Sequence, residues 1–228
     1  MLGRVLGFAF VLAGCGSSAH EPPIGSLERS TTVDDDVMHV HAAGRAVPLH
    51  EVAEITEHLG LPMNGTGDID VDVSVPLVRG QPDFTRATGS AALRCAPCAL
   101  GDDAAVLATK RHGAFGGDLH FGHVAFDTVD LQLAFAGGHA DITRWVVRSA
   151  DVRLEAALHV DLDRTFAHSR VRGCVRFAPT PDLAKRDANL ATMLQLVGAP
   201  RGPDDLYAVK LDGTLDEPKL LAMLCDQP

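Results

Sequence analysis

The sequence predicts a mainly β (α+β) fold, in which one long, curved, mostly antiparallel sheet forms an open half-barrel and two short helices cover it. Apolar and polar residues alternate along most of the chain from residue 33 onward, and this period of two is typical of half-buried strands. Two segments show apolar residues at helical spacing instead. No glycine-rich phosphate loop follows a strand, so the pattern does not indicate a nucleotide-binding strand–helix–strand fold.

The clearest strand is the segment DIDVDVSVP, residues 68–76, in which isoleucine or valine alternates with aspartate or serine. Successive side chains of a strand point to opposite faces of the sheet, so this segment has one apolar and one acidic face. The same alternation returns in four later segments: 118–138, 140–162, 169–179 and 206–215. Turns that contain glycine and aspartate separate these segments, which predicts that one strand follows another in a single sheet.

Two helices are predicted between the strands. Pro48 stands at a favourable first-turn position of the segment 47–62, whose apolar residues recur every three or four positions. The segment 180–200 repeats this spacing, and both segments end in a glycine with a proline two residues later. A short helix with one apolar side packs that side on a sheet, so we expect both helices to cover the sheet.

The charge balance limits the partners of the protein. With 20 lysine and arginine residues against 30 aspartate and glutamate residues, the formal charge is −10. This surface repels phosphate backbones, and no basic cluster offsets it locally, so nucleic acid is not an expected partner. The hydrophobic fraction of 46% is sufficient for a single elongated domain with its own core.

The N-terminus, MLGRVLGFAFVLAGCGSS, has the layout of a bacterial lipoprotein signal. One positive charge, Arg4, precedes an apolar run that is shorter than the about 20 residues that a membrane-spanning helix needs. The quartet Leu12-Ala13-Gly14-Cys15 then matches a lipobox, in which the cysteine is acylated and becomes the first mature residue.

This signal divides the chain into a signal peptide at 1–14, a flexible tether rich in serine, proline and glycine at 15–32, and a single elongated β domain at 33–228. Gly16 follows the acylated cysteine at the position where a signal for inner-membrane retention usually has aspartate. We therefore expect a lipid-anchored protein of the Gram-negative cell envelope that faces the periplasm, with the outer membrane favoured over the inner.

Two of the five cysteines, Cys95 and Cys98, form a Cys-x-x-Cys motif. The cell envelope is oxidising, so a disulfide between them is the favoured interpretation. A redox motif needs its first cysteine at the start of a helix, whereas the following ALGDDAAVLA is typical of a turn and another strand. Redox chemistry, a metal site and pairing with Cys174 or Cys225 remain alternatives, and whether Cys174 and Cys225 pair with each other stays open.

No catalytic, cofactor or metal site is predicted. His39 and His41 would share one face of a strand, and His120 and His123 lie near a bend. Zinc requires three or four convergent ligands, and nothing in the sequence shows which histidines converge. The chain also contains no Gly-x-Ser-x-Gly motif of a serine nucleophile.

From Leu59 to the end, the order of these features resembles the type II secretion system protein N family, within the larger AsmA-like group. The matching segments are LGLPMNGTGDIDVDVSVP at 59–76, ATGSAALRCAPCALGDD at 87–103, ADITRWVVRSADVRLEAALHVDL at 140–162, and residues 176–221. The resemblance implies an envelope protein with a curved β-sheet that exposes an apolar inner groove, and it brings no catalytic residues. Members of that family usually carry an N-terminal transmembrane helix, where this chain has a lipobox.

These features together favour a non-enzymatic envelope lipoprotein that is accessory to type II protein secretion. The alternatives are a periplasmic lipid-binding or lipid-transfer module and a thiol-disulfide enzyme built on Cys95 and Cys98. The expected partners are the membrane, through the lipid anchor, components of type II secretion, and phospholipid acyl chains. Apolar side chains of the predicted strands either line the groove or form an ordinary core: Phe121, Leu131, Leu133, Phe135, Trp145 and Val147.

Acylation of Cys15 predicts how the protein fractionates. Cys15→Ser removes the acceptor thiol of the lipobox, so we expect this variant to move from the membrane fraction to the soluble fraction. Immunoblots of both fractions measure the shift, with Ser17→Ala as a control that keeps the thiol. Unchanged membrane attachment of Cys15→Ser contradicts the lipoprotein assignment.

Overall fold

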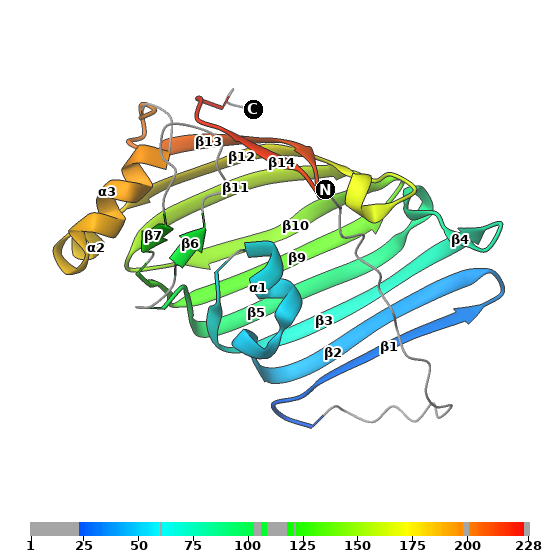
Figure 1. Ribbon diagram of the computed structural model, residues 1–228. Helices are drawn as coiled ribbons and strands as arrows, with labels where there is room; N and C mark the ends of the chain where they lie inside the picture. The colour runs from blue at the N-terminus through cyan, green and yellow to red at the C-terminus, as the bar shows by residue number, and fades with distance from the viewer. Residues whose placement is uncertain are drawn as a thin grey trace.

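A computed structural model describes residues 23–59, 61–102, 106–108, 118–120, 122–197 and 201–225. In these residues, a single open sheet of twelve strands forms the body of the protein (Figure 1). Every strand pair is antiparallel, and the two ends of the strand order do not pair with each other. The predicted fold class is therefore confirmed.

The strands of the sheet are β1 (Leu27–Asp34), β2 (Val37–Pro48), β3 (Met63–Val78), β4 (Gln81–Pro82), β5 (Thr88–Leu100), β8 (Val124–Phe126), β9 (Thr128–Ala136), β10 (His139–Arg148), β11 (Val152–Asp161), β12 (Arg170–Pro179), β13 (Tyr207–Thr214) and β14 (Pro218–Leu221). They follow one another across the sheet as β1-β2-β3-β5-β9-β10-β11-β12-β13-β14, with β4 paired to β3 and β8 paired to β5. A separate pair consists of β6 (Val106–Ala108) and β7 (Asp118–His120). Neighbours in the sheet are thus mostly neighbours in the sequence, as expected for strands joined by tight turns.

The sheet begins at Leu27, inside the segment 15–32 that the sequence predicts as a tether, so the boundary expected at residue 33 was wrong. β1 pairs with β2 along its whole length, and a tight turn at Asp35 and Asp36, with φ of 47° and 60°, joins the two strands. The strand LERSTTVD lies at the edge of the sheet and is mostly polar and exposed, so it lacks the apolar alternation that predicted the other strands. Cys15 and the signal peptide lie outside the described residues.

Both segments that were predicted as helical contain helices. The helices are α1 (Ala53–Leu59), α2 (Pro181–Arg186) and α3 (Ala188–Val197), and single turns of 3-10 helix lie at η1 (Leu49–Glu51), η2 (Phe84–Arg86) and η3 (Phe166–His168). Thr180 caps α2 through its side chain, and Asp187 accepts a hydrogen bond from the Leu190 N–H at 2.9 Å. Asp187 thereby starts a new helix and divides the second segment in two. No helix within the described ranges is long and apolar enough to span a membrane.

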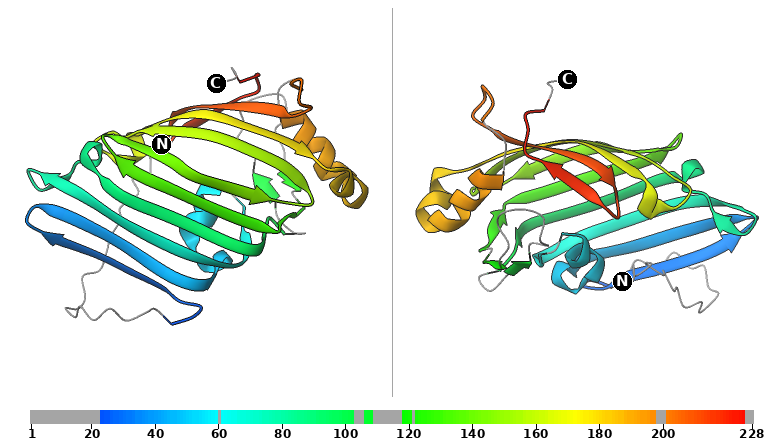
Figure 2. Two further views of the ribbon diagram at one scale, coloured as in Figure 1. Left: turned by 180° about the vertical axis from the view of Figure 1, so that it is seen from behind. Right: turned by 45° about the horizontal axis from the view of Figure 1, so that its top comes forward.

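The alternation along the strands gives the sheet one apolar face and one polar face. The register of the strands preserves this division, because Leu93 lies opposite Ile69 on β3 and opposite Leu131 on β9, and Leu131 lies opposite Trp145 on β10. The sheet is curved, and α1 lies across one of its faces (Figure 2). That face is the apolar one, because Ile55 of α1 packs against the same buried cluster as Leu93 and Leu131.

Two buried clusters cover the apolar face at opposite ends of the strands. The first lies under the helices and comprises Leu49, Leu61, Met63, Cys95, Cys98, Val124, Phe126, Val129, Val152, Leu183, Leu190 and Ala191. The second lies at the other ends of the strands, where Phe84 of η2 packs on it, and comprises Val73, Val75, Ala87, Ala140 and Leu162. The core is therefore split into two parts, with the middle of the sheet between them.

Asp151, in the turn between β10 and β11, joins the sheet to α2. Its carboxylate accepts two hydrogen bonds from Arg186 of α2, at 2.6 and 2.7 Å, and one from the Ala125 N–H of β8 at 2.7 Å. The Asp151 side chain is 1% exposed and that of Arg186 is 42% exposed. Burial raises the pKa of Asp151, but the hydrogen bonds from Arg186 and Ala125 outweigh it and hold this pKa below the ordinary 3.8.

Loss of the Asp151 charge is expected to destabilise the fold. In Asp151→Asn the side chain no longer accepts from both Arg186 and Ala125 as a carboxylate does, so we expect the free energy of unfolding to fall by about 1.5–3 kcal/mol at pH 7. Urea unfolding measures this loss. Asp182→Asn is the control, because Asp182 is exposed and its 3.4 Å contact with Lys185 is worth little.

The same pair predicts a pH dependence. Because the folded-state pKa of Asp151 is lowered, its contribution to stability is full above the unfolded pKa of about 3.9 and is lost as the pH falls through the folded value. The difference between wild type and Asp151→Asn should therefore shrink below about pH 4. A difference that is equal at pH 7 and at pH 2.5 contradicts this assignment.

Candidate functional site

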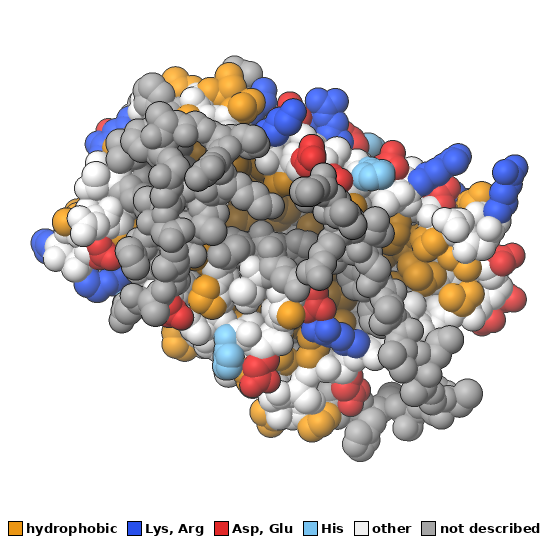
Figure 3. Space-filling view, in the orientation of Figure 1, with side chains coloured by type: hydrophobic (Ala, Val, Ile, Leu, Met, Phe, Trp, Pro, Cys, Tyr) orange, Lys and Arg blue, Asp and Glu red, His pale blue; other side chains and the backbone are white. Residues whose placement is uncertain are grey.

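The middle of the apolar face lies between the two clusters and is the candidate binding surface. Five half-buried side chains of β9, β10 and β11 lie there and belong to neither cluster in the described part of the chain: Leu133, Ile142, Trp145, Ala156 and Leu158. Figure 3 looks onto this face and shows hydrophobic side chains in the parts of the sheet that are visible in this view. We call these five residues the apolar floor.

The structure places five of the six predicted groove residues on the apolar face. By register, Leu131, Leu133 and Phe135 of β9 share this face with Trp145 and Val147 of β10. Leu131 and Val147 pack against the first buried cluster and Phe135 packs against the second, so these three belong to the margins of the core. Leu133 and Trp145 lie in the apolar floor. The sixth residue, Phe121, lies outside the described residues.

An opening in the sheet lies beside this floor, between β10 and β11. The two strands form ladder pairs at three positions, from His139↔Asp161 to Asp141↔His159, whereas β11 and β12 pair along their whole length. A bulge between Ile142 and Arg144 bends β10 where the ladder with β11 stops. The strands then run apart until the turn that contains Asp151 joins them again.

A depression of about 520 Å³ lies at this opening. Its lining contains side chains of both faces of the sheet: Ile142, Thr143, Trp145, Ala156, Ala157, Leu158, His159, Arg172 and Gly173. Gly173 keeps β12 close to β11 at this point, because a Cβ there would lie 2.3 Å from the Ala157 carbonyl oxygen. The depression therefore extends the apolar floor below the surface of the sheet and ends at charged groups of the polar face.

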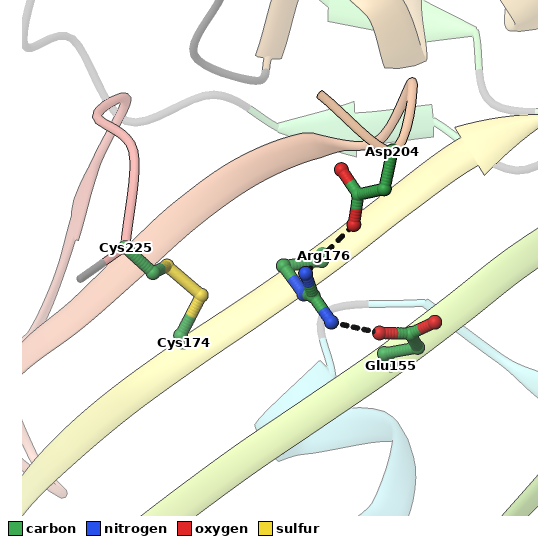
Figure 4. Close-up of a disulfide and its surroundings, with 5 residues drawn as sticks. All are labelled: Glu155, Cys174, Arg176, Asp204 and Cys225. Carbon is green, nitrogen blue, oxygen red and sulfur yellow. Dashed lines mark hydrogen bonds and ion pairs between the residues drawn. A yellow bond between two sulfur atoms is a disulfide. The ribbon is translucent and has the colours of Figure 1, made fainter. Parts of the chain in front are cut away.

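Opposite charges face one another across neighbouring strands on the polar face. Asp130 of β9 accepts hydrogen bonds from Nε of Arg94 on β5 at 3.2 Å and from Nε of Arg144 on β10 at 2.6 Å. Arg176 of β12 contacts both Glu155 and Asp204 (Figure 4). Exposed pairs of this kind contribute about 0–1 kcal/mol each, so they favour the correct register more than they stabilise the sheet.

Two histidines and two aspartates meet on the polar face where the β10–β11 ladder ends. His159 Nδ1 lies 2.5 Å from Asp141 Oδ1, and Asp161 Oδ1 lies 3.1 Å from both His159 Nε2 and His139 Nδ1. The other oxygen of Asp161 contacts Arg172. The hydrogen bond with Asp141 raises the pKa of His159, an effect that burial opposes and Asp161 reinforces. We call His139, Asp141, His159 and Asp161 the His–Asp cluster.

This cluster is not among the sites predicted from the sequence, although the sequence carries a signal for it. The motif His-x-Asp occurs at residues 139–141 and again at 159–161. Only the antiparallel pairing of β10 with β11 shows that each histidine of one motif faces the aspartate of the other. The histidines that were considered first are placed elsewhere: His39 lies on β2, where its Nδ1 is 3.0 Å from Ser74 Oγ.

Four of the cysteines form two disulfides. Cys95 and Cys98 are joined within β5, which confirms the favoured interpretation, and both are buried in the first cluster. The second disulfide joins Cys174 of β12 to Cys225 near the C-terminus, a pairing that the sequence left open (Figure 4). It holds the segment after β14 against the polar face of the sheet.

Comparison of the chain with protein-family models, with curated proteins and with solved structures finds no match. The geometry of the sheet is therefore the evidence for its function.

The two disulfides are expected to differ in their contribution to stability. Cys174 and Cys225 are separated by 51 positions and Cys95 and Cys98 by three, and cross-links that close longer loops constrain the unfolded chain more. We expect the Cys174→Ala/Cys225→Ala double variant to lose about 2–4 kcal/mol of unfolding free energy, and the Cys95→Ala/Cys98→Ala double variant to lose less through chain entropy. Urea unfolding of the two variants at pH 7 gives the comparison.

Alkylation provides the control for that experiment. Neither pair should react with iodoacetamide until the protein is unfolded and reduced. Rapid alkylation of Cys95 and Cys98 without reductant, together with reduction of insulin by the protein, contradicts their structural role.

Proposed function

We propose that this chain is a non-enzymatic envelope lipoprotein whose apolar face binds the hydrocarbon chains of lipids. The observation that carries the proposal is the apolar floor, which lies between the two buried clusters and continues into the depression beside β10. Contiguous apolar surfaces of this kind are uncommon on proteins that bind nothing. The lipobox at Cys15 supports the proposal, because it would hold this face close to a membrane.

The chemistry of the floor favours a hydrocarbon over an extended peptide. Its side chains are aliphatic except for Trp145, and the ladders with β9 and β12 pair the backbone groups on the outer sides of β10 and β11. Among the described residues of these two strands, only the edges that face the opening lack ladder partners beyond the three pairs from His139 to Asp141. An extended peptide laid flat over the floor, away from those two edges, would lose hydrogen bonds to water and find few replacements, which costs free energy for each group. An acyl chain has no such groups to satisfy.

Burial of a hydrocarbon chain on such a surface is a favourable contribution to binding. Burial of one methylene group is worth about 0.8 kcal/mol, so ten buried methylenes give roughly 8 kcal/mol, the scale of a micromolar complex before the costs of association. The polar headgroup would remain outside the floor, toward solvent. The protein would then carry or present a lipid without a chemical step.

A role in type II secretion is the second candidate. It is supported by the order of the segments that resemble the type II secretion system protein N family, and by the open curved sheet that this resemblance implies. An apolar face on an accessory protein could hold a partner of the secretion machinery in place of lipid.

The hypothesis of a thiol-disulfide enzyme has weaker support. Cys95 and Cys98 lie within a strand and are buried, whereas an attacking cysteine of that chemistry is accessible and lies at the start of a helix.

Lipid content tests the first candidate. Full-length protein extracted gently from membranes should carry phospholipid that mass spectrometry detects after solvent extraction. In Leu133→Glu a carboxylate lies in the apolar floor, so we expect the lipid content to fall several-fold. Gln132→Glu is the matched control, because Gln132 is the preceding residue of β9 and faces the polar side of the sheet.

Circular dichroism establishes that both variants keep the sheet, and Leu158→Glu provides a second substitution in the floor if Leu133→Glu does not fold. Lipid-free wild-type protein, or equal lipid in Leu133→Glu and Gln132→Glu, contradicts lipid binding. Deletion of the gene separates the second candidate: a depleted set of secreted proteins, with lipid-free purified protein, supports the role in secretion.

A further inference from the structure

The His–Asp cluster is built by two copies of the same short motif. His139 and Asp141 extend from β10, and His159 and Asp161 extend from β11, with one residue between the members of each pair. Residues two apart in a strand point to the same face, so all four side chains lie on the polar face. The register sets His139 opposite Asp161 and Asp141 opposite His159, and these are the outer two of the three pairs that join the strands.

The distances within the cluster suit a metal ion. One ligand atom each from His139, His159 and Asp161 lies within 4.8 Å of the others. Asp161 Oδ1 is 3.1 Å from both imidazole nitrogens that face it. Ligand atoms that bind a tetrahedral zinc at about 2.1 Å lie about 3.4 Å apart, so the two contacts of Asp161 are already close to this spacing, and small side-chain rotations would adjust the distance between the two imidazoles.

The groups around these three atoms also suit a metal. Asp141 holds His159 at Nδ1, at 2.5 Å, and thereby directs Nε2 toward Asp161, which is the arrangement in which a carboxylate orients a metal-binding histidine. Arg172 occupies the other oxygen of Asp161 and leaves Oδ1 toward the histidines. Two carboxylates against one guanidinium leave the cluster with a net negative charge when the imidazoles are neutral, which attracts a cation.

Carboxylates contact His159 at both ring nitrogens, and both carboxylates accept hydrogen bonds. A neutral imidazole has one N–H and can donate to one of the two. The second nitrogen then points a lone pair at a carboxylate, unless a proton or a metal ion lies between them. A divalent cation bound at Nε2 and shared with Asp161 satisfies both groups at once.

We propose that His139, His159 and Asp161 bind a zinc ion, with Asp141 as the residue that orients His159. Two imidazoles and one carboxylate are ligands that zinc prefers, and the exposed position leaves its fourth site to water. Calcium and magnesium prefer sets of oxygen ligands and are not expected here. The ion would cross-link β10 and β11 at the short ladder that ends at the opening, and would hold that side of the depression closed.

Metal titration of the full, untagged chain tests the site. After dialysis against EDTA and then metal-free buffer at pH 7.5, isothermal calorimetry should show one Zn²⁺ bound per chain, with no binding of Ca²⁺ or Mg²⁺. Zn²⁺ should also raise the melting temperature, because it binds the folded state alone. His139→Ala, His159→Ala and Asp161→Asn should each abolish both effects.

Two further variants separate this site from adventitious binding. Asp141→Asn keeps all three ligands, and we expect a loss of about 10–100-fold in Zn²⁺ affinity, as for other partners that orient a ligand. His39→Ala is the matched control, because His39 also lies on the polar face of the sheet, on β2. We expect this variant to bind Zn²⁺ with the same affinity as the wild type. All five substituted residues are at least partly exposed, so we expect every variant to fold without metal. Circular dichroism of the metal-free proteins tests this.

The outcomes are distinct. Loss of Zn²⁺ binding in the three ligand variants, with retention in His39→Ala, supports the site. No Zn²⁺ binding by wild type, or equal Zn²⁺ affinity in His159→Ala and His39→Ala, overturns it. If a ligand variant does not fold, the shift of the His139 and His159 imidazole resonances of the wild type on addition of Zn²⁺ decides the question, and a shift of other histidines alone overturns the proposal.

Discussion

The alternation of apolar and polar side chains obliges this protein to bury one face of a wide sheet, and the only other sheet in the described residues is the short β6–β7 pair. Two sets of elements cover that face at the ends of the strands. The helices α1, α2 and α3 lie over one buried cluster, and the turn η2 packs on the other. Because neither set reaches the middle, the apolar floor is a direct consequence of the single-layer architecture.

The opening between β10 and β11 gives this face its depth. Along most of the sheet, the backbone groups of each strand form hydrogen bonds with both neighbouring strands, so the strands lie side by side without a gap. The bulge between Ile142 and Arg144 interrupts this regularity, so Trp145, Ala156 and Leu158 line a hollow in place of a continuous ladder. The turn at Asp151, tied to α2 and β8, closes the far end of the opening and sets its length.

The apolar floor and the proposed metal site meet at the end of this opening where the β10–β11 ladder stops. His159 and Arg172 line the depression, and both also contact Asp161 of the His–Asp cluster. A metal ion that fixes the last rungs between β10 and β11 would therefore restrict the width of the hollow beside them. Binding on the apolar face and ion binding on the polar face can be coupled through this one pair of strands, with no movement of the rest of the sheet.

The sequence by itself determined the strands, the two helical segments and the favoured pairing of Cys95 with Cys98, because each depends on local pattern: a period of two, a period of three to four, or a spacing of three residues. Pattern was insufficient for β1, whose polar residues form an edge strand by pairing with β2. The Cys174–Cys225 disulfide, the opening beside Trp145 and the His–Asp cluster were decided by the tertiary structure alone. Each of them joins residues from different strands or from distant parts of the chain, and their proximity follows from strand register and curvature, which a single strand does not encode.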